Sequence, residues 1–391
     1  MDNKKLIPNL RFPEFKGVWK SSELKKITSY VDYRGRAPKK SNKGHFLVTA
    51  KNIKKGYIDY DCSKEFVAEE DYSTVMSKGL PLIGDVLFTT EAPMGNVAQV
   101  NKKDITLAQR VIKFRGSELI DNSFLLYYML SNVFQKTIKT KAIGSTVQGI
   151  SGKELHKTIV SFPKLSEQEK IASFLTEVDS KLTQLTKKKA LLENYKKGVM
   201  QKIFNQKIRF KDNKGNNYPN WEEKTLGEVF KVSAGGDIKK INVSKEKTED
   251  FKFPIFANSE KKEGLYGYSN IYKIDFECIT VTGRGSLGNA IARYKKFYPI
   301  VRLLVLKPKI KLNVFFFENI INQLNILSES TGVPQLTAPQ VSKYKLNFPC
   351  LEEQEKIANF LSEIDNKIKT LNTKIENNKS FKKGLLQKMF V

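Results

Sequence analysis

The chain has 391 residues, of which 40% are hydrophobic and 28% charged, so it is long enough for two or three domains with real cores. Its 68 Lys and Arg residues against 41 Asp and Glu residues give a net charge of +27, which attracts polyanions such as nucleic acid; a basic surface kept for solubility alone needs far less charge. Three isolated cysteines exclude a disulfide framework, the spread of lysines disfavours a membrane surface, and no apolar run is long enough to span a bilayer, so a cytoplasmic protein is expected.

Residues 1–160 are predicted to form a first globular domain. Short β-rich runs separated by Gly and Pro indicate a mixed α+β domain with many loops. A basic, aromatic loop at residues 30–40 offers Arg side chains for guanine edges and Lys side chains for phosphates, and a solvated charged loop is the alternative interpretation. The predicted DNA contacts in this domain are Arg34, Arg36, Lys39, Lys40, Lys51, Asn52, Gln109, Arg110 and Gln148.

Residues 161–205 are predicted to form a long helix. Roughly 40 residues at a rise of 1.5 Å give a length of about 60 Å. An apolar residue recurs every seven positions, which is typical of the seam of a coiled coil. The residues of this repeat are Ile171, Val178, Leu185, Leu192 and Val199, accompanied by Leu175, Leu182 and Ile203 and interrupted by Lys189 and Lys196.

Residues 206–347 are predicted to form a second globular domain of the same kind. A G-x-G-x-x-G run at residues 283–288 lacks the acidic residue that a dinucleotide site needs about 20 positions later, so it is interpreted as a tight turn. Arg284 lies between two of these glycines, which lets its backbone approach a groove closely. The predicted DNA contacts in this domain are Lys239, Lys240, Asn258, Ser259, Arg284 and, by analogy with Gln148, Gln335.

Residues 348–391 are predicted to form a second long helix that repeats the first with an offset of 186 residues. Because each helix has one apolar stripe, each needs a partner, and we expect the two to pack antiparallel on one another; two unrelated amphipathic helices, each packed on its own domain, are the alternative. The second apolar series comprises Ile357, Ile364, Leu371 and Leu385, flanked by Leu361, Ile368, Ile375 and Met389 and interrupted by Asn378.

The repeat extends to the openings of the two globular segments, although their contents diverge. Leu24 follows Trp19 by five residues, and Leu226 follows Trp221 by five residues. The predicted fold class is therefore α+β, with two mixed α/β domains joined by two long antiparallel coiled-coil helices in a pseudo-two-fold internal repeat. The two copies match at their openings and in their helices, while the globular segments between differ in sequence. This combination indicates one scaffold that presents two different recognition surfaces.

The sequence offers no residues for a catalytic centre. Its only histidines, His45 and His156, have no Cys or His close in sequence, so neither a metal site nor a Ser-His triad is expected. No phosphate-binding loop, nuclease-like carboxylate pair followed by a useful lysine, or amino-methyltransferase motif is present. The chain is predicted to bind without catalysing a reaction.

At this point the chain resembles the specificity subunits of type I restriction-modification systems over essentially its whole length. The resemblance rests on the order of variable segment, repeated helix, variable segment and repeated helix, on the loop from Asp32 to Pro38, and on the openings of the helices. These openings read Phe162-Pro163, Glu167-Gln168-Glu169-Lys170-Ile171-Ala172 and Phe174-Leu175 in the first copy, and Phe348-Pro349, Glu353-Gln354-Glu355-Lys356-Ile357-Ala358 and Phe360-Leu361 in the second.

The resemblance implies that the two variable segments are target-recognition domains, each reading one half of a bipartite, asymmetric sequence in double-stranded DNA. It also implies that the helices act as a spacer and as the docking site for two methyltransferase subunits, which restriction subunits then join. No catalytic residue and no cofactor is implied for this chain, because the partners bind S-adenosylmethionine and ATP. The alternatives are a basic coiled-coil adaptor without DNA readout, an RNA-binding protein and a nuclease.

Overall fold

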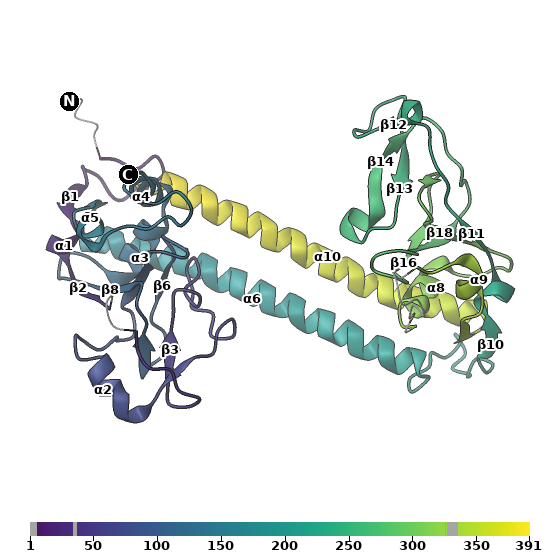
Figure 1. The fold of residues 1–391 in the computed structure, drawn as a ribbon, viewed down its shortest axis with the longest axis horizontal. Helices are drawn as coiled ribbons and strands as arrows, with labels where there is room; N and C mark the ends of the chain where they lie inside the picture. Colours follow the sequence, from purple (N-terminus) through teal and green to yellow (C-terminus); the bar gives the residue numbers. More distant parts are fainter. Residues whose placement is uncertain (1–5, 34–36, 325, 327–334) are drawn as a thin grey trace. The chain divides into compact units, whose positions relative to one another are not determined.

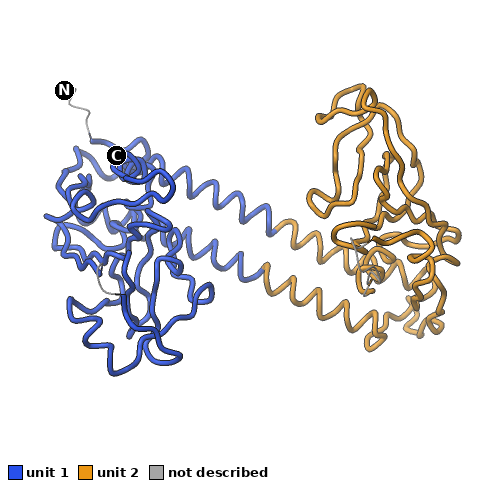
Figure 2. Tube along the Cα trace, in the orientation of Figure 1, with its two compact units in different colours: residues 1–188, 371–391 blue, residues 189–370 orange. Residues whose placement is uncertain are grey.

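A computed structural model describes residues 6–33, 37–324, 326 and 335–391 of the chain. The predicted contacts Arg34 and Arg36 lie outside the described residues. The chain forms two compact units, as Figure 2 shows: unit 1 comprises residues 1–188 and 371–391, and unit 2 comprises residues 189–370. No helix in the described part of the chain is both long and apolar enough to cross a membrane.

Unit 1 is built around a four-stranded sheet with the strand order β2-β8-β5-β6 (Figure 1). A three-stranded sheet, β4-β3-β7, and a two-stranded sheet, β1-β9, accompany it. The elements are β1 (Lys20–Glu23), α1 (Leu24–Ile27), β2 (Thr28–Asp32), β3 (His45–Val48), β4 (Phe66–Val67), α2 (Tyr72–Val75), β5 (Val86–Thr89), β6 (Val97–Gln99), β7 (Ile105–Leu107), β8 (Val111–Gly116), α3 (Asn122–Leu130), α4 (Asn132–Thr140), α5 (Gly152–His156) and β9 (Ile159–Phe162).

Unit 2 has the corresponding four-stranded sheet, with the order β11-β18-β15-β16. A second sheet, β12-β14-β13-β17, and the pair β10-β19 complete its strands. The elements are β10 (Glu222–Thr225), α7 (Leu226–Val229), β11 (Phe230–Ala234), β12 (Val243–Ser244), β13 (Phe253–Phe256), β14 (Leu265–Ser269), β15 (Cys278–Val281), β16 (Ala290–Arg293), β17 (Tyr298–Pro299), β18 (Leu304–Pro308), α8 (Val314–Ile321), α9 (Ala338–Ser342) and β19 (Lys345–Phe348).

The strand orders show that the two units share one scaffold despite their divergent sequences. In both, the main sheet is antiparallel, and the second sheet contains one parallel pair, β3 with β7 and β13 with β17. Large aromatic side chains fill each core, with Phe88 and Phe124 fully buried in unit 1 and Phe316 and Phe317 fully buried in unit 2. The predicted fold class is confirmed.

The repeated Glu at the start of each long helix binds the opening of the same unit. In unit 1, Arg11 donates to both carboxylate oxygens of Glu167 at 2.7 Å, and Trp19 Nε1 donates to the same group at 3.3 Å. Unit 2 has the matching network, in which Arg209 and Trp221 donate to Glu353. The shared openings therefore position the first strand of each unit against the start of its helix.

The Gln that follows this Glu in each copy also binds residues of its own unit. We call each Glu-Gln pair, with the residues that it binds, the Glu-Gln joint. Gln168 Nε2 donates to the Pro163 carbonyl at 2.9 Å, and Gln168 Oε1 accepts from Asp121 N, the N-cap of α3. In unit 2, Gln354 makes the equivalent bonds to Pro349 and to the N-cap of α8. Because both side-chain ends are used, each long helix is fixed to a core helix of its own unit.

The two long helices are α6 (Leu165–Phe204) and α10 (Leu351–Lys388), and each contributes one end to unit 1 and the other to unit 2. All residues of the predicted seams are buried or half-buried, including the interrupting Lys189, Lys196 and Asn378. In unit 1, Lys382 Nζ lies 2.6 Å from Asp179 Oδ1, and in unit 2, Lys196 Nζ lies 2.6 Å from Asp365 Oδ1. These equivalent ion pairs confirm the antiparallel pairing and show why lysine is accommodated at the seam.

Candidate nucleic-acid interface

One turn in each unit has the same backbone hydrogen bonds but carries different side chains. In unit 1 it connects β5 to β6, and the amides of Gly95-Asn96 donate to the carbonyl and hydroxyl oxygens of Thr89 at 2.9 Å. In unit 2 it connects β15 to β16, and the amides of Gly288-Asn289 donate to the same atoms of Thr282 at 2.9 and 3.0 Å. The G-x-G-x-x-G run is thus a hairpin turn between antiparallel strands, as predicted, and not the entry to a helix.

A second segment reaches each turn in a left-handed backbone conformation. Arg110 has φ of 77° immediately before β8, and Val301 and Arg302 have φ of 42° and 61° shortly before β18. Residues other than glycine rarely adopt this region, and a β-branched valine is especially disfavoured there. Such strained residues cluster at functional sites, where the surrounding structure holds them in place.

A third segment, the loop before α5 in unit 1 and before α9 in unit 2, pairs with the turn in each unit. Isolated bridges pair Glu91 with Gly149 in unit 1 and Arg284 with Gln335 in unit 2. The residue equivalent to Gln335 is therefore Gly149, and the predicted analogy between Gln148 and Gln335 is wrong by one residue. We refer to Glu91, Arg110 and Gly149 as the turn cluster of unit 1, and to Arg284, Arg302 and Gln335 as the turn cluster of unit 2.

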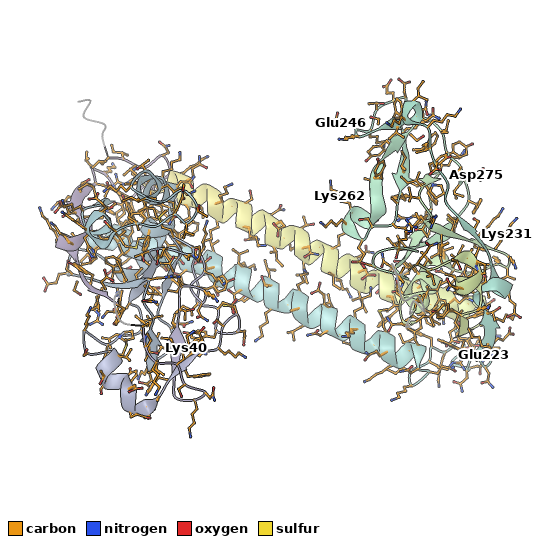
Figure 3. All side chains as sticks on the ribbon, viewed as in Figure 1. Lys40, Glu223, Lys231, Glu246, Lys262 and Asp275 are labelled. Atoms are coloured by element: carbon orange, nitrogen blue, oxygen red, sulfur yellow. The ribbon has the colours of Figure 1, made fainter. Side chains whose placement is uncertain are left out.

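The turn cluster of unit 1 contains an ion pair. Arg110 Nε lies 2.7 Å from Glu91 Oε1, and the two side chains are 48% and 42% exposed. Beside them lies a pocket of about 310 Å³ whose walls include the predicted contacts Lys40, Lys51, Gln109 and Arg110. Lys40, labelled in Figure 3, is exposed and forms an ion pair with Glu65 at 3.0 Å. The structure thus brings four predicted residues from three loops to the walls of one pocket.

The turn cluster of unit 2 is held by one amide oxygen. Arg302 Nη1 donates to Gln335 Oε1 at 2.8 Å, and Arg284 Nη2 donates to the same oxygen at 3.3 Å. Asn258 supports the turn from behind, because its Oδ1 accepts from Gly283 N at 2.7 Å and its Nδ2 donates to the Val301 carbonyl. Asn258 therefore orders the cluster through its backbone. Arg302 is exposed, whereas Arg284 is half-buried.

The other described candidates take no part in the hydrogen bonds and ion pairs that form the turn clusters. Lys39, Lys239, Lys240, Ser259 and Gln148 are exposed, and no ion pair is formed by any of these lysines with a described acidic residue. Their exposure is compatible with contacts to phosphate, which need charge without a fixed partner. They stay predictions.

Asn52 is a structural residue in this fold, which argues against the predicted DNA contact. It is fully buried, its Oδ1 accepts from the amide and hydroxyl of Thr49 at 3.0 and 2.8 Å, and its Nδ2 donates to the carbonyls of Asp59 and Ser63 at 2.9 and 2.8 Å. The side chain closes the 49–63 loop on itself. No capacity is left for a base.

Asn52→Ala is expected to lower the free energy of unfolding by about 1–3 kcal/mol, because it leaves buried backbone groups without partners. In a unit of this size, that corresponds to a melting temperature lower by roughly 2–12 °C. Thermal unfolding of the full chain measures the effect, with the exposed Lys55→Ala as the control. A variant with wild-type stability would contradict the structural role of Asn52.

Glu91 and Arg302 belong to the turn clusters but were not predicted from the sequence. Glu91 precedes Gly95 by four residues, as Arg284 precedes Gly288, so the repeated Gly-Asn landmark contained the signal for it. Arg302 has no comparable signal, because its left-handed conformation and its bond to Gln335 depend on the assembled sheet.

The chain is similar in sequence to known proteins over both of its repeats. The sequence matches the family model described as the type I restriction modification DNA specificity domain over residues 16–194 and again over residues 218–378. A putative type I specificity subunit of Mycoplasma pneumoniae is 27% identical over 324 residues, covering 82% of this chain and 81% of that protein. A putative type I restriction enzyme specificity subunit of Methanocaldococcus jannaschii is 26% identical over 396 residues, covering 94% and 92%.

Solved structures agree at the level of the fold. The crystal structure of the type I restriction-modification system S subunit from M. genitalium has a TM-score of 0.67 at 17% identity, covering 98% of this chain and 99% of that chain. A chain from a structural study of the assembly and conformational transition of the type I R-M system has a TM-score of 0.56 at 16% identity, covering 94% and 96%.

Proposed function

Because the chain belongs to the family of type I restriction-modification DNA specificity proteins, we propose that its two units read the two halves of a bipartite, asymmetric DNA target. The observation that carries this proposal is the pair of turn clusters, in which one backbone frame presents different polar groups. An asymmetric target requires this combination, since equivalent placement gives both units access to a groove and different side chains give each its own sequence. Direct readout of base edges requires such side chains.

The boundaries of the reading domains follow from the same proposal. Residues 1–160 and 206–347 form the two target-recognition domains, and residues 161–205 and 348–391 form the helical parts. Two recognition domains bound to one face of B-DNA lie about one helical turn apart, roughly 34–36 Å. A helix of about 60 Å is long enough to set such a separation. The helices are thus proposed to fix the number of unread base pairs.

The partners proposed for the chain are double-stranded DNA, two methyltransferase subunits docked on the helices, and restriction subunits in the full complex. The same buried Glu-Gln joint fixes each helix to its own unit, so the exposed faces of the two repeated helices are equivalent and are proposed to dock two copies of one kind of subunit. We assign no catalytic step and no cofactor to this chain. Its contribution is to choose the site at which the partners act.

Replacing Lys239 and Lys240 by Gln is expected to reduce the salt dependence of DNA binding by the complex with its methyltransferase. Each neutralised phosphate contributes about 0.9 to the slope of log K against log salt, so the slope should fall by about 1.8. Fluorescence anisotropy at several salt concentrations measures it. Lys224 and Lys345, which already pair with Glu222 and Glu223, are the matched control pair and should leave the slope unchanged.

The same assay distinguishes the proposal from the adaptor alternative. An adaptor uses its charge for assembly alone, so its complex would not bind a random duplex at moderate salt. A specificity subunit binds that duplex weakly through phosphates and its own target much more tightly. Absence of DNA binding in the presence of the methyltransferase would favour the adaptor and overturn the proposed function.

A further inference from the structure

We propose that the turn cluster of unit 2 reads a guanine, whereas the turn cluster of unit 1 reads a cytosine or an adenine through its amino group in the major groove. This inference rests on the proposed function and names the residues that separate one half-site from the other. Three observations carry it: the equivalent position of the clusters, the hydrogen-bonding character of their exposed groups, and the conformation that holds the arginines.

The clusters occupy equivalent positions in the two scaffolds. In each unit a strand-to-strand turn, a left-handed residue before the neighbouring strand and the loop before a short helix meet. In unit 1 backbone hydrogen bonds join all three segments. In unit 2 backbone bonds join the turn to the loop, and the side chains of Asn258 and Gln335 connect them to the left-handed segment. Glu91 corresponds to Arg284, and Arg110 corresponds to Arg302. A carboxylate in one unit is thus replaced by a guanidinium in the other at a fixed place on the fold.

The polar groups that the unit 2 cluster leaves for a ligand are donors: Arg302 is exposed, and Arg284 and Gln335 are half-buried. Gln335 Oε1 accepts from Arg284 and Arg302, so the amide nitrogen of Gln335 is oriented away from both guanidinium groups. Within the described part of the chain, neither guanidinium forms an ion pair, and the buried Nε of Arg284 has no acceptor. Guanine presents two acceptors, N7 and O6, in the major groove, while adenine and cytosine present an amino donor there. A donor cluster therefore favours guanine.

The unit 1 cluster combines an acceptor with a donor. One carboxylate oxygen of Glu91 accepts from Arg110 Nε, which leaves the second oxygen and the Nη groups of Arg110 for other partners. A carboxylate accepts from the N4 amino group of cytosine, or from the N6 amino group of adenine, and it repels phosphate and guanine O6. This cluster therefore favours a cytosine or an adenine at the position where unit 2 favours guanine.

The left-handed backbone fits a reading role for Arg302. Val301 and Arg302 have φ of 42° and 61°, and the Val301 side chain is 48% exposed, so packing in the core does not explain this conformation. Instead, the conformation delivers the Arg302 side chain to Gln335. A fixed guanidinium makes two parallel bonds to guanine, whereas a phosphate contact needs only the charge.

The test measures base selectivity in variants of the full chain, in complex with the methyltransferase. The duplexes carry the motif that the wild-type complex modifies, with each base pair of each half varied in turn. Arg302→Asn removes the guanidinium and introduces a residue that tolerates the left-handed conformation. Arg302→Lys keeps the positive charge but removes the paired N–H donors of the guanidinium. Arg284→Gln and Glu91→Gln test the other two groups. Lys231→Gln, at an exposed strand position labelled in Figure 3, is the control.

We expect Arg302→Asn, Arg302→Lys and Arg284→Gln each to reduce discrimination at one base pair of one half-site from about tenfold or more to less than about threefold. Glu91→Gln should do so in the other half-site, and Lys231→Gln should change neither. Weaker binding that is uniform across all duplexes and is restored in Arg302→Lys would identify a phosphate contact and overturn the inference. So would unchanged selectivity in all four variants.

Failure of the proposed function gives a different result. In that case the wild-type complex itself shows no preference among the duplexes, before any variant is compared. A selective wild type with unselective variants supports both proposals, and a selective wild type whose variants keep full selectivity contradicts the inference alone.

Discussion

Removing one heptad from each long helix is expected to shorten the unread spacer of the target by about three base pairs without changing either half-site. Seven residues at a rise of 1.5 Å correspond to about 10.5 Å, and base pairs in B-DNA are about 3.4 Å apart. Deleting residues 184–190 of α6 and 371–377 of α10 keeps the seam in register, because each helix loses one full heptad. Genome-wide mapping of modified bases measures the spacer directly.

The deletion also has a cost that the same experiment detects. Three base pairs turn the second half-site by more than a quarter of a duplex turn, since one turn takes about 10–10.5 base pairs. The DNA must twist or bend to present both half-sites, so we expect less complete modification at the new motif. A control with Lys187 and Lys188, both exposed on α6, replaced by Gln keeps the length and should keep the spacer. An unchanged spacer in the shortened protein would show that the helices do not set it.

Glu353→Ala is expected to lower the free energy of unfolding by about 3 kcal/mol, because removing one member of a buried ion pair leaves the other charge without compensation. Glu353 is fully buried, and its loss leaves Arg209 and the Trp221 N–H without their acceptor. For a unit of this size the melting temperature should fall by roughly 6–12 °C. Glu167→Ala should have an equivalent effect, because it removes the same joint from unit 1.

Hydrogen exchange separates the two variants. Glu353→Ala should lose protection at the start of α10 and in β10, and Glu167→Ala at the start of α6 and in β1, because each carboxylate binds only residues of its own unit. The exposed Glu355→Ala, two residues further along α10, is the control and should match the wild type. Wild-type stability in both buried variants would mean that the joints do not hold the helices.

The repeat made most of the architecture predictable. An offset of 186 residues identified two copies of one unit, and the seven-residue spacing identified the seam, whose members the structure buries or half-buries. The role of the repeated Glu and Gln was not predictable, because identity between copies shows that a residue matters without showing its partner. That partner, Arg11 or Arg209, lies more than 140 positions away.

The candidate site was predictable only in part. Lys40, Lys51, Gln109 and Arg110 come from basic or polar loop segments, and the structure brings them to one pocket. Asn52 belongs to the same segment as Lys51, yet its neighbours fold around it and bury it, which depends on the path of the loop after it. The pairing of Arg302 with Gln335 depends on strand register and on a left-handed turn, neither of which leaves a pattern in the sequence.

The central claim is that the two units read separate half-sites at a fixed distance, and mapping of modified bases in a genome tests it most directly. Cells that express this chain with its methyltransferase partner should show one motif with two different half-sites and a spacer of constant length. Cells that lack the chain should not modify that motif. A continuous or palindromic motif, a variable spacer, or modification that does not depend on the chain would contradict the account.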